Sequence, residues 1–409
     1  MANINLTPDM ITREAIRILH QKLNFVGNCV RDYDDRYAQE GAKIGDSLRV
    51  RMPIQYATST AATMPTGTGA DSIGVSTTLQ VSSKRYVPMR FTSEELTLDI
   101  EDFSSRHIEP AMSVLAAKVE ADVLSTALAG ASNFVNAGTA VEFLDIMNGA
   151  KTLTDALAPR NDRYALLNTQ AMVDLVNANK SLFADQTELS RQYKEGMMGR
   201  FSGMDFYENT LLPAMAAHTA GGDNAYDVNT TTAGKTLSAS DSDPNNQTLA
   251  IDTGTKVIAK GAKFTMAGCN DVHPETKEDT GALKVFTVTG GDTGTATATS
   301  ITISPAIIAT GPHKNCTAAP ANNATITFLE DATANRQSLL FQKGFAAFAT
   351  ADLVMPKGTD MASRQNFDGL SLRMIRDYDI IKDRILTRID ILYGFKVLRP
   401  SHGCVIHDD

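Results

Sequence analysis

The chain has 409 residues, and its 38 Lys and Arg against 47 Asp and Glu give a formal net charge of −9. A chain of this length is expected to hold two or three domains and to bury a substantial core. Proteins that neutralise nucleic-acid phosphates carry a basic balance or basic patches, so this acidic composition disfavours nucleic-acid binding as the primary activity.

The distribution of arginine is uneven. All 20 arginines lie within residues 13–200 or 336–399, and residues 201–335 contain none. An even distribution would place about seven arginines in that segment. The gap therefore predicts a compositionally separate module in this part of the chain.

The four cysteines are Cys29, Cys269, Cys316 and Cys404, and no two of them form a Cys-x-x-Cys pair. This spacing excludes a disulfide scaffold and a standard zinc knuckle. The N-terminus shows no basic stretch followed by an apolar one, and no apolar run approaches the ~20 residues that cross a bilayer. We therefore expect a soluble protein made in a reducing cytoplasm.

The first elements in chain order are a helix and a long hairpin. Thr7-Pro8-Asp9 is typical of a helix start, and apolar residues then recur at helical spacing. Residues 44–55 and 75–91 alternate with period two, which predicts two strands of a ribbon that is roughly 40 Å long. A two-stranded ribbon is not stable alone and needs a surface to lie on. Its basic residues are Lys43, Arg49, Arg51, Lys84, Arg85 and Arg90.

An acidic segment and a long helix follow the hairpin. Thr92-Ser-Glu-Glu95 matches a capping box at a helix start. Five acids lie between residues 91 and 105 without a Lys or Arg, and they are Glu94, Glu95, Asp99, Glu101 and Asp102. Pro110 then opens a second helix that continues to Gly130, long enough at about 30 Å to act as a structural spine.

Residues 141–220 are predicted to alternate between helix and strand. Residues 142–158 form a helical pattern, residues 164–168 a short buried strand, and Asn168 or Thr169 begins the next helix. Residues 221–333 instead show short β-prone runs separated by turn residues, with 7 Lys against 12 Asp and Glu. This pattern predicts an inserted antiparallel β-barrel or sandwich. A long strand over residues 383–393 is expected near the end of the chain.

Three stretches together resemble a known family. They are residues 43–130 with the hairpin and spine helix, Arg163-Tyr-Ala-Leu-Leu-Asn168 with its helix, and Arg388-Ile-Asp-Ile-Leu-Tyr-Gly-Phe-Lys-Val-Leu-Arg-Pro400. In this order they resemble the major capsid protein of tailed double-stranded DNA bacteriophages, of the short-tailed-phage type with an inserted β domain. The inserted segment contributes Gly261-Ala-Lys-Phe-Thr-Met-Ala-Gly268 to the resemblance.

The resemblance implies an α+β fold with an N-terminal arm, an extended hairpin loop, a spine helix, peripheral and axial domains, and an inserted small antiparallel β-barrel. The corresponding ranges are 1–42 for the N-terminal helical arm, 43–91 for the hairpin arm, 92–140 for the spine helix and peripheral domain, 141–220 for the first axial part, 221–333 for the inserted β domain and 334–409 for the second axial and peripheral part.

The resemblance also implies a shell protein of the virion, assembled in the bacterial cytoplasm through pentamers and hexamers. The implied partners are further copies of the chain, a scaffolding protein, a portal protein and a decoration protein, with double-stranded DNA enclosed without sequence-specific binding and no membrane partner. Some relatives cross-link the shell through a lysine near the hairpin tip. The tip here, residues 57–74, has no lysine, so covalent cross-linking is not expected.

The hairpin and the acidic segment suggest an inter-subunit contact. We hypothesise that Arg49, Arg51, Lys84 and Arg85 pair with a neighbouring subunit's acids at Glu94, Glu95, Asp99, Glu101 and Asp102. Each exposed pair would contribute only about 0–1 kcal/mol, so the effect would depend on repetition over many copies.

No catalytic, cofactor-binding or metal-binding residue is predicted, and no cofactor is expected. His402, Cys404, His407, Asp408 and Asp409 could collect a metal, but a frayed C-terminal tail is the expectation. Two other classes stay open at this point. One is a surface adhesin-like or other structural protein with an inserted immunoglobulin-like domain, and the other is a cytoplasmic enzyme with an inserted lid.

Overall fold

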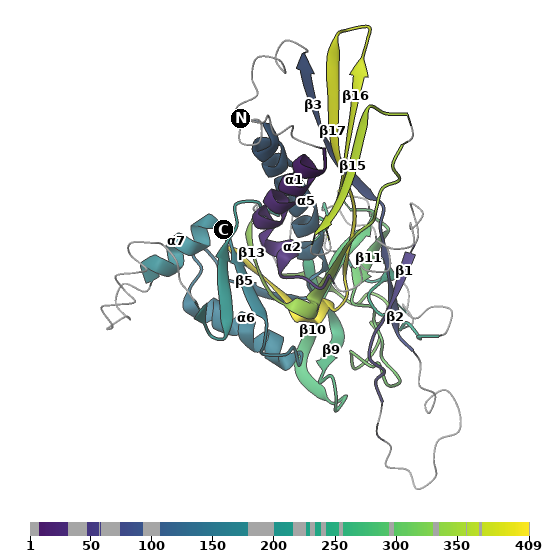
Figure 1. Ribbon diagram of the computed structural model, residues 1–409. Helices are drawn as coiled ribbons and strands as arrows, with labels where there is room; N and C mark the ends of the chain where they lie inside the picture. The colour runs from purple at the N-terminus through teal and green to yellow at the C-terminus, as the bar shows by residue number, and fades with distance from the viewer. Residues whose placement is uncertain are drawn as a thin grey trace. The chain divides into compact units, whose positions relative to one another are not determined.

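A computed structural model describes most of the chain and shows a mixed α+β architecture (Figure 1). The described residues are 8–31, 47–56, 58, 74–92, 107–178, 200–215, 226–229, 234–238, 243–252, 257–293, 298–329, 335–356, 358–367 and 370–408. Unit 1 comprises Met1–Leu48, Leu79–Leu124 and Ala346–Lys396, and unit 2 comprises Arg49–Thr78, Ser125–Phe345 and Val397–Asp409. The α+β class expected from the sequence is confirmed.

Among its described residues, unit 1 has the helices α1 (Pro8–Lys22), α2 (Asn24–Gly27) and α5 (Glu109–Gly130), the last up to Leu124. The helical stripes predicted from the spacing of apolar residues are buried in both α1 and α5. Glu120 of α5 is also buried, and its carboxylate accepts hydrogen bonds from the backbone N–H groups of Asn24 and Phe25, each at 3.1 Å. A buried carboxylate is stable there because the first N–H groups of α2 have no partner within the helix.

The sheet of unit 1 has the order β14-β17-β16-β15, and β3 pairs with β17 as an additional strand off this path. The strands are β3 (Ser83–Thr92), β14 (Ala346–Thr350), β15 (Met361–Phe367), β16 (Leu370–Asp379) and β17 (Arg384–Val397). The register between β3 and β17 runs from Arg384↔Thr92 to Tyr393↔Ser83.

This pairing divides the second arm of the expected hairpin. Only β2 (Ser76–Gln80) pairs with β1 (Ser47–Arg51), in a two-stranded sheet. Residues 83–92 instead pair with β17, which comes about 300 residues later in the chain. The apolar alternation of residues 75–91 predicted a strand, but it carried no information about the strand's partner.

Unit 2 contains a six-stranded sheet of order β4-β18-β13-β5-β7-β6. Its strands are β4 (Asn133–Asn136), β5 (Arg163–Leu167), β6 (Arg200–Phe201), β7 (Met204–Glu208), β13 (Arg336–Gln342) and β18 (Gly403–Asp408). Helices α6 (Phe143–Asp155) and α7 (Thr169–Ala178) belong to the same unit.

The frayed C-terminal tail expected from the sequence is wrong. Residues 403–408 form β18, which pairs in parallel with β4 and antiparallel with β13, and all six of its residues are buried. His407 contacts Gln337, and the Asp408 carboxylate accepts hydrogen bonds from Arg336 and Asn168. The sequence indicated that these polar side chains are solvated. In the structure they have hydrogen-bond partners on β13 and at Asn168, directly after β5.

Buried polar side chains at the two ends of β5 hold α6 and α7. The Arg163 guanidinium donates to the carbonyl oxygens of Ala158 at 2.6 Å and Pro159 at 2.9 Å, just after α6. At the other end, the Asn168 side chain accepts the backbone N–H of Ala171 at 2.7 Å and begins α7. The expected helix start at Asn168 or Thr169 is thus resolved in favour of Asn168.

In unit 2, the residues between β7 and β13 form a five-stranded sheet of order β12-β9-β10-β11-β8. Its antiparallel strands are β8 (Gln247–Ala250), β9 (Lys263–Val272), β10 (Asp279–Gly291), β11 (Ser300–Ser304) and β12 (Ile326–Phe328). Residues 226–229 bridge both edges, because Val228 pairs with Ile251 after β8 and Asp227 pairs with Thr325 before β12. The sheet is therefore closed, which selects the barrel from the two architectures that the sequence predicted.

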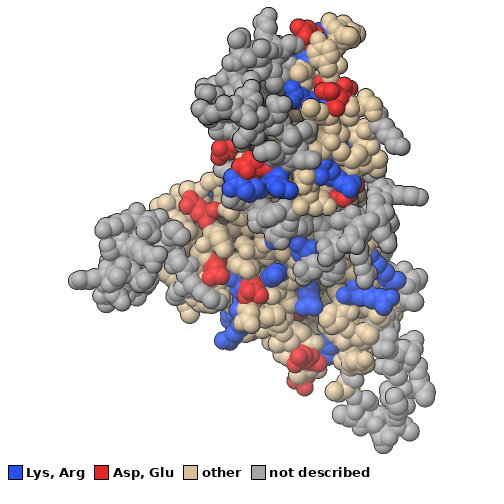
Figure 2. All heavy atoms as spheres, in the orientation of Figure 1, with Lys and Arg blue, Asp and Glu red and all other residues tan. Residues whose placement is uncertain are grey.

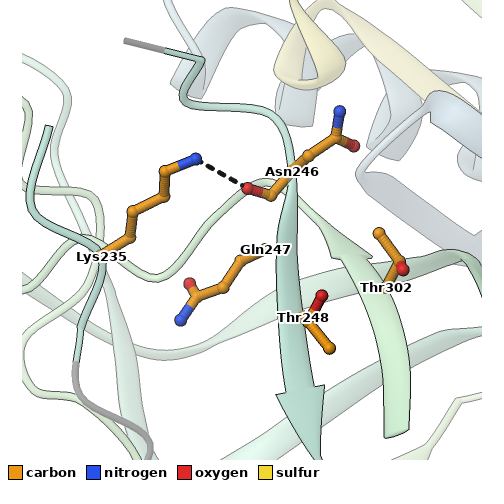
Figure 3. Close-up of a pocket in the computed structure, with 5 residues that line it drawn as sticks. All are labelled: Lys235, Asn246, Gln247, Thr248 and Thr302. Atoms are coloured by element: carbon orange, nitrogen blue, oxygen red, sulfur yellow. Dashed lines mark hydrogen bonds between the residues drawn. The ribbon is translucent and has the colours of Figure 1, made fainter. Parts of the chain in front are cut away.

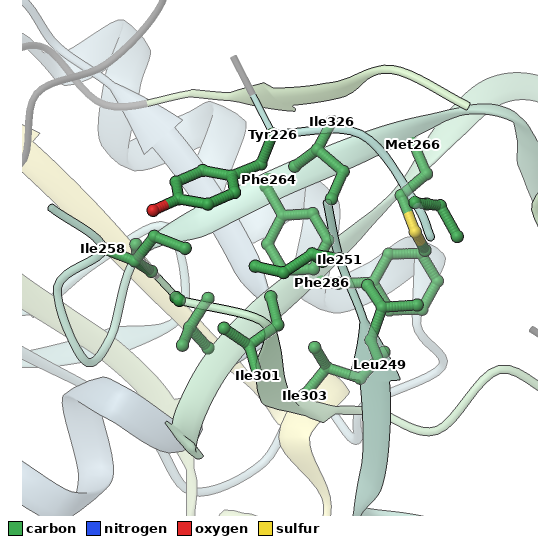
Figure 4. Close-up of a cluster of buried hydrophobic side chains, with 14 of the residues drawn as sticks. Tyr226, Leu249, Ile251, Ile258, Phe264, Met266, Phe286, Ile301, Ile303 and Ile326 are labelled. Atoms are coloured by element: carbon green, nitrogen blue, oxygen red, sulfur yellow. The ribbon is translucent and has the colours of Figure 1, made fainter. Parts of the chain in front are cut away.

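The barrel has a core of its own (Figure 4). Phe264 and Phe286 stack with ring centroids 5.9 Å apart, and Tyr226, Ile301 and the other apolar side chains around them are almost fully buried. This core makes residues 226–328 a compact β-barrel within unit 2. We call this segment the β domain.

Candidate inter-subunit surface

The two basic residues on the first strand of the hairpin are both exposed, but their surroundings differ. Arg49 Nε donates to the Ser76 hydroxyl across the β1–β2 pair at 2.6 Å. Arg51 stands at the end of β1, and within the described residues no ion pair engages it. Arg51 is therefore the more available of the two cations for a contact outside the chain.

Lys84 and Arg85 follow each other on β3, so their side chains point to opposite faces of the sheet. Arg85 is occupied within unit 1, since its Nε lies 2.7 Å from Asp122 Oδ2 on α5. The Tyr393 hydroxyl donates to the same carboxylate oxygen at 2.9 Å. Burial, together with Asp122, raises the pKa of Tyr393 to about 12, and the Asp122 carboxylate raises the pKa of Arg85. This three-residue cluster joins β3, β17 and α5, which gives Arg85 a role inside the fold.

The acidic half of the hypothesis lies outside the described residues. Glu94, Glu95, Asp99, Glu101 and Asp102 all fall between β3 and the start of the described part of α5. The structure therefore brings together none of the nine residues as a basic–acidic pair, and the contact stays a prediction.

The base of the hairpin packs on the β domain. Met52 and Val75 share an apolar cluster with Leu237, Ala306 and Ile308. This cluster is called the arm anchor below. Polar contacts flank it, because Lys277 Nζ donates to Gln55 Oε1 at 2.9 Å and the Thr77 hydroxyl lies 3.4 Å from Asp243 Oδ2. No sequence pattern indicated this contact, since its two sides are more than 150 residues apart in the chain.

Two isoleucines at the β16–β17 turn, together with Val354, are the most exposed large apolar residues in the described part of unit 1. Ile380 is 82% and Ile381 is 87% exposed. The turn is held by an ion pair between Arg384 and Asp379 at 3.1 Å and by a hydrogen bond from the Tyr378 hydroxyl to Asp383 at 2.7 Å. Exposed apolar side chains on an ordered turn are typical of contact surfaces. Two consecutive isoleucines among charged residues were the sequence signal for this feature.

The described surface carries no large field of one sign on the face drawn in Figure 2, where basic and acidic side chains are interspersed. On the sheet formed by β3, β17 and β16, basic and acidic side chains form ion pairs with each other. Asp390 has a fully buried side chain and accepts hydrogen bonds from Arg373 and Arg388, and Arg388 also lies 3.9 Å above the Tyr86 ring.

A pocket of about 370 Å³ lies at the edge of the β domain (Figure 3). Its lining residues are Lys235, Asn246, Gln247, Thr248 and Thr302. The Lys235 ammonium donates to the backbone carbonyls of Asp243 and Asn246, so the one cation of the lining binds the chain itself. None of the five is a carboxylate, histidine or cysteine, so the lining offers no general base or thiol nucleophile.

The described residues were also searched for metal sites and membrane-spanning helices. Within the described ranges, no three His, Cys, Asp or Glu side chains converge as a metal site requires. Among the same residues, no helix combines the length and the apolar character that crossing a bilayer demands.

The comparisons with known proteins settle the family. The model of the family described as "P22 coat protein - gene protein 5" matches residues 15–406. The chain belongs to the P22 coat protein family. It is therefore a bacteriophage major capsid protein, a structural component of the virion shell. The resemblance stated from the sequence is confirmed, and the adhesin-like alternative is not supported.

Similar solved structures were also found. A Mycobacterium phage Che8 chain is 10% identical with a TM-score of 0.48, over 94% of this chain and 90% of that chain. The capsid structure of cyanophage P-SCSP1u is 11% identical with a TM-score of 0.44, over 90% and 84%. The CUS-3 coat protein I-domain is 29% identical with a TM-score of 0.21, over 27% of this chain and 98% of that chain. No curated protein matches the chain.

Proposed function

We propose that the protein self-assembles through pentamers and hexamers into an icosahedral shell that encloses double-stranded DNA. The observation that carries this proposal is the match of the coat protein family model to nearly the whole chain. The net charge of −9 fits a shell that encloses DNA without binding its sequence, because a strongly cationic protein would hold the packaged phosphates tightly. The exposed Ile380–Ile381 turn offers an apolar surface for contacts between subunits.

Arg51 on β1 of the arm and Lys84 on β3, which pairs with β17, are each proposed to make a charged inter-subunit contact. Both side chains are exposed, and Arg85 is bound to Asp122 within its own chain. Their proposed partners are the acids at 94–102 of a neighbouring subunit. The hypothesis from the sequence is thereby narrowed, since Arg49 and Arg85 are given roles inside the subunit.

The arm anchor supports this proposal for Arg51, which lies on β1. A ribbon presents its charges at a defined place only if its base is held, and the anchor supplies an apolar contact flanked by hydrogen bonds. The β domain is thus proposed to position the arm of its own subunit. A scaffolding protein, a portal protein and a decoration protein are the further partners proposed, with assembly in the host cytoplasm.

The experiment is a charge exchange in the full-length protein expressed with its scaffolding protein. Reversal of Arg51 and Lys84 to glutamate is expected to reduce the yield of closed shells several-fold, as counted by electron microscopy and sedimentation. Reversal of Glu94 and Glu101 to lysine is expected to do the same, and the combination is expected to recover shells. K151E/K260E is the matched control, since it makes the same change in net charge at two exposed lysines.

The outcomes test the charged inter-subunit contact separately from assembly into a shell. If the fourfold variant assembles no better than either double variant, the arm contact is wrong while the shell function stands. If the wild-type protein forms only a small discrete oligomer with its scaffolding protein, self-assembly into a shell is itself refuted.

A further inference from the structure

Two of the four cysteines lie side by side in the β domain. Cys269 is on β9 and Cys316 is in the segment that runs beside it, and both are fully buried and free. Their thiols are hydrogen-bonded to each other. The sequence separates them by 46 residues, so their spacing gave no indication of a pair.

The backbone explains why the thiols meet. Cys316 forms an antiparallel bridge with Asp271, and the Thr317 N–H donates to the Asn270 carbonyl at 3.0 Å. This register places Cys269 and Cys316 on the same face as diagonal neighbours across two strands. Gly268 comes directly before Cys269 with φ +79°, at an irregularity of β9 that turns the strand. Diagonal neighbours have Cα atoms about 7–8 Å apart, slightly more than the roughly 4.4–6.8 Å that a disulfide spans. Bond formation therefore requires the segment that carries Cys316 to move slightly toward β9.

The surroundings make the two thiols chemically different. The hydrogen bond from Cys269 lowers the pKa of Cys316, burial opposes that shift, and Lys284 adds to it. Lys284 is held in place by Asp271 Oδ1 at 2.6 Å. The same thiol contact raises the pKa of Cys269, and burial adds to the shift. Cys316 is therefore the better nucleophile of the pair.

Cys29 and Cys404 differ from this pair in their surroundings. Burial raises the pKa of Cys29 and raises the pKa of Cys404 to about 11. Cys404 lies in β18 of the six-stranded sheet, and Cys29 belongs to unit 1. Both are therefore expected to stay as thiols under mild oxidation.

We propose that Cys269 and Cys316 are a built-in oxidation site that forms an intramolecular disulfide when the particle leaves the reducing cytoplasm of its host. The oxidant is a small-molecule disulfide. Local opening exposes the Cys316 thiolate, which attacks one sulfur of the oxidant and expels the first small thiol. Cys269 then attacks the mixed disulfide at the Cys316 sulfur and expels the second. Two cysteine thiols are oxidised, one small disulfide is reduced, and the two protons leave on the two small thiols.

The disulfide would close a loop that contains β10 and β11 and would thereby stabilise the β domain. Cross-linking a long loop removes conformational freedom from the unfolded state. We expect the melting temperature of the β domain to rise by about 10 °C on oxidation. The stabilisation would be absent during assembly and present in the released particle.

The test exposes the full-length protein, and assembled shells, to oxidised glutathione and counts titratable thiols after denaturation. Wild type is expected to fall from four thiols to two, and its intact mass is expected to fall by two hydrogen atoms. Peptide mapping should join Cys269 to Cys316. C269S and C316S should each lose the melting shift, whereas the matched controls C29S and C404S should retain it.

Wild-type protein that keeps four thiols, or that joins any other pair, overturns the proposal. Peptide mapping of the wild type needs no variant, so the result stands even if a serine variant fails to fold. The outcome is also independent of shell assembly, because the unassembled chain is measured alongside the shells.

Discussion

Replacing Gly394 by alanine is expected to destabilise unit 1 strongly. Gly394 lies on β17 in the Tyr-Gly pair that carried part of the family resemblance. A methyl group at this position would collide with the carbonyl oxygen of Gln80 and would lie 2.9 Å from the Val81 Cα, whereas ordinary contacts begin at 3.4 Å. The obstacle is backbone, so no side-chain rotation relieves it.

The loss of stability in this variant depends on how far the backbone must shift to make room for the methyl group. Either β17 or the segment between β2 and β3 must shift by at least about 0.5 Å, and the β3–β17 ladder begins only two residues beyond Val81, at Ser83↔Tyr393. Overpacking of this kind typically costs about 1–3 kcal/mol, because the surrounding side chains lose their contacts. For a unit of this size each kcal/mol lowers the melting temperature by roughly 2–4 °C.

The assay is thermal and urea unfolding of the unassembled protein followed by far-ultraviolet circular dichroism, since the chain has no tryptophan. Gly290→Ala is the matched control. Gly290 is also a strand glycine, but its added methyl group would meet only the Thr302 Cβ at 4.0 Å. If G394A melts within about 1 °C of wild type, or if G290A loses as much stability, the steric argument is refuted.

Two further predictions concern buried charge and pH. Asp390→Ala should destabilise unit 1 by about 3 kcal/mol, because it leaves the mostly buried Arg373 without its carboxylate partner. Arg388→Met, at the half-exposed partner of Asp390, should cost about 1 kcal/mol or less. Urea unfolding of both variants measures the two losses, and a larger loss of stability in Arg388→Met than in Asp390→Ala would contradict the prediction. Burial, assisted by Arg399, lowers the pKa of His402 to about 4, below the value near 6.5 of an unfolded histidine. The unfolded state then binds more protons, so stability should be constant above pH 6.5 and should fall by on the order of 3 kcal/mol toward pH 4. Unfolding measured between pH 4 and 7 should show a smaller fall in His402→Gln, and equal slopes would disprove the role of this group.

The features that the sequence predicted well are those that depend on local spacing. The buried stripes of α1 and α5 and the buried strand β5 follow from apolar residues at intervals of three to four or in a short run. Arg163 and Asn168 at the ends of β5 are part of the family resemblance, and Asn168 was one of two candidates for the start of α7. The arginine gap at residues 201–335 contains the β domain, which has its own core and a closed sheet.

The sequence predicted the candidate site only in part. It identified Arg51 and Lys84 as basic residues of the arm, but it could not separate them from Arg85, whose partner Asp122 is 37 residues away. The arm anchor and the exposed turn at residues 380–381 were also missed. A contact between distant segments leaves no periodic pattern in either of them, so such contacts escape an argument from spacing.

By itself, the sequence determined the buried faces of the main helices, most strand runs and the capsid family. Only the tertiary structure decided strand partners. It assigned residues 83–92 to β17, placed residues 403–408 inside a sheet, and brought the Cys269 and Cys316 thiols into contact. The physical reason is that apolar periodicity specifies which face of an element is buried, whereas pairing depends on which other elements compete for its hydrogen bonds and its apolar face.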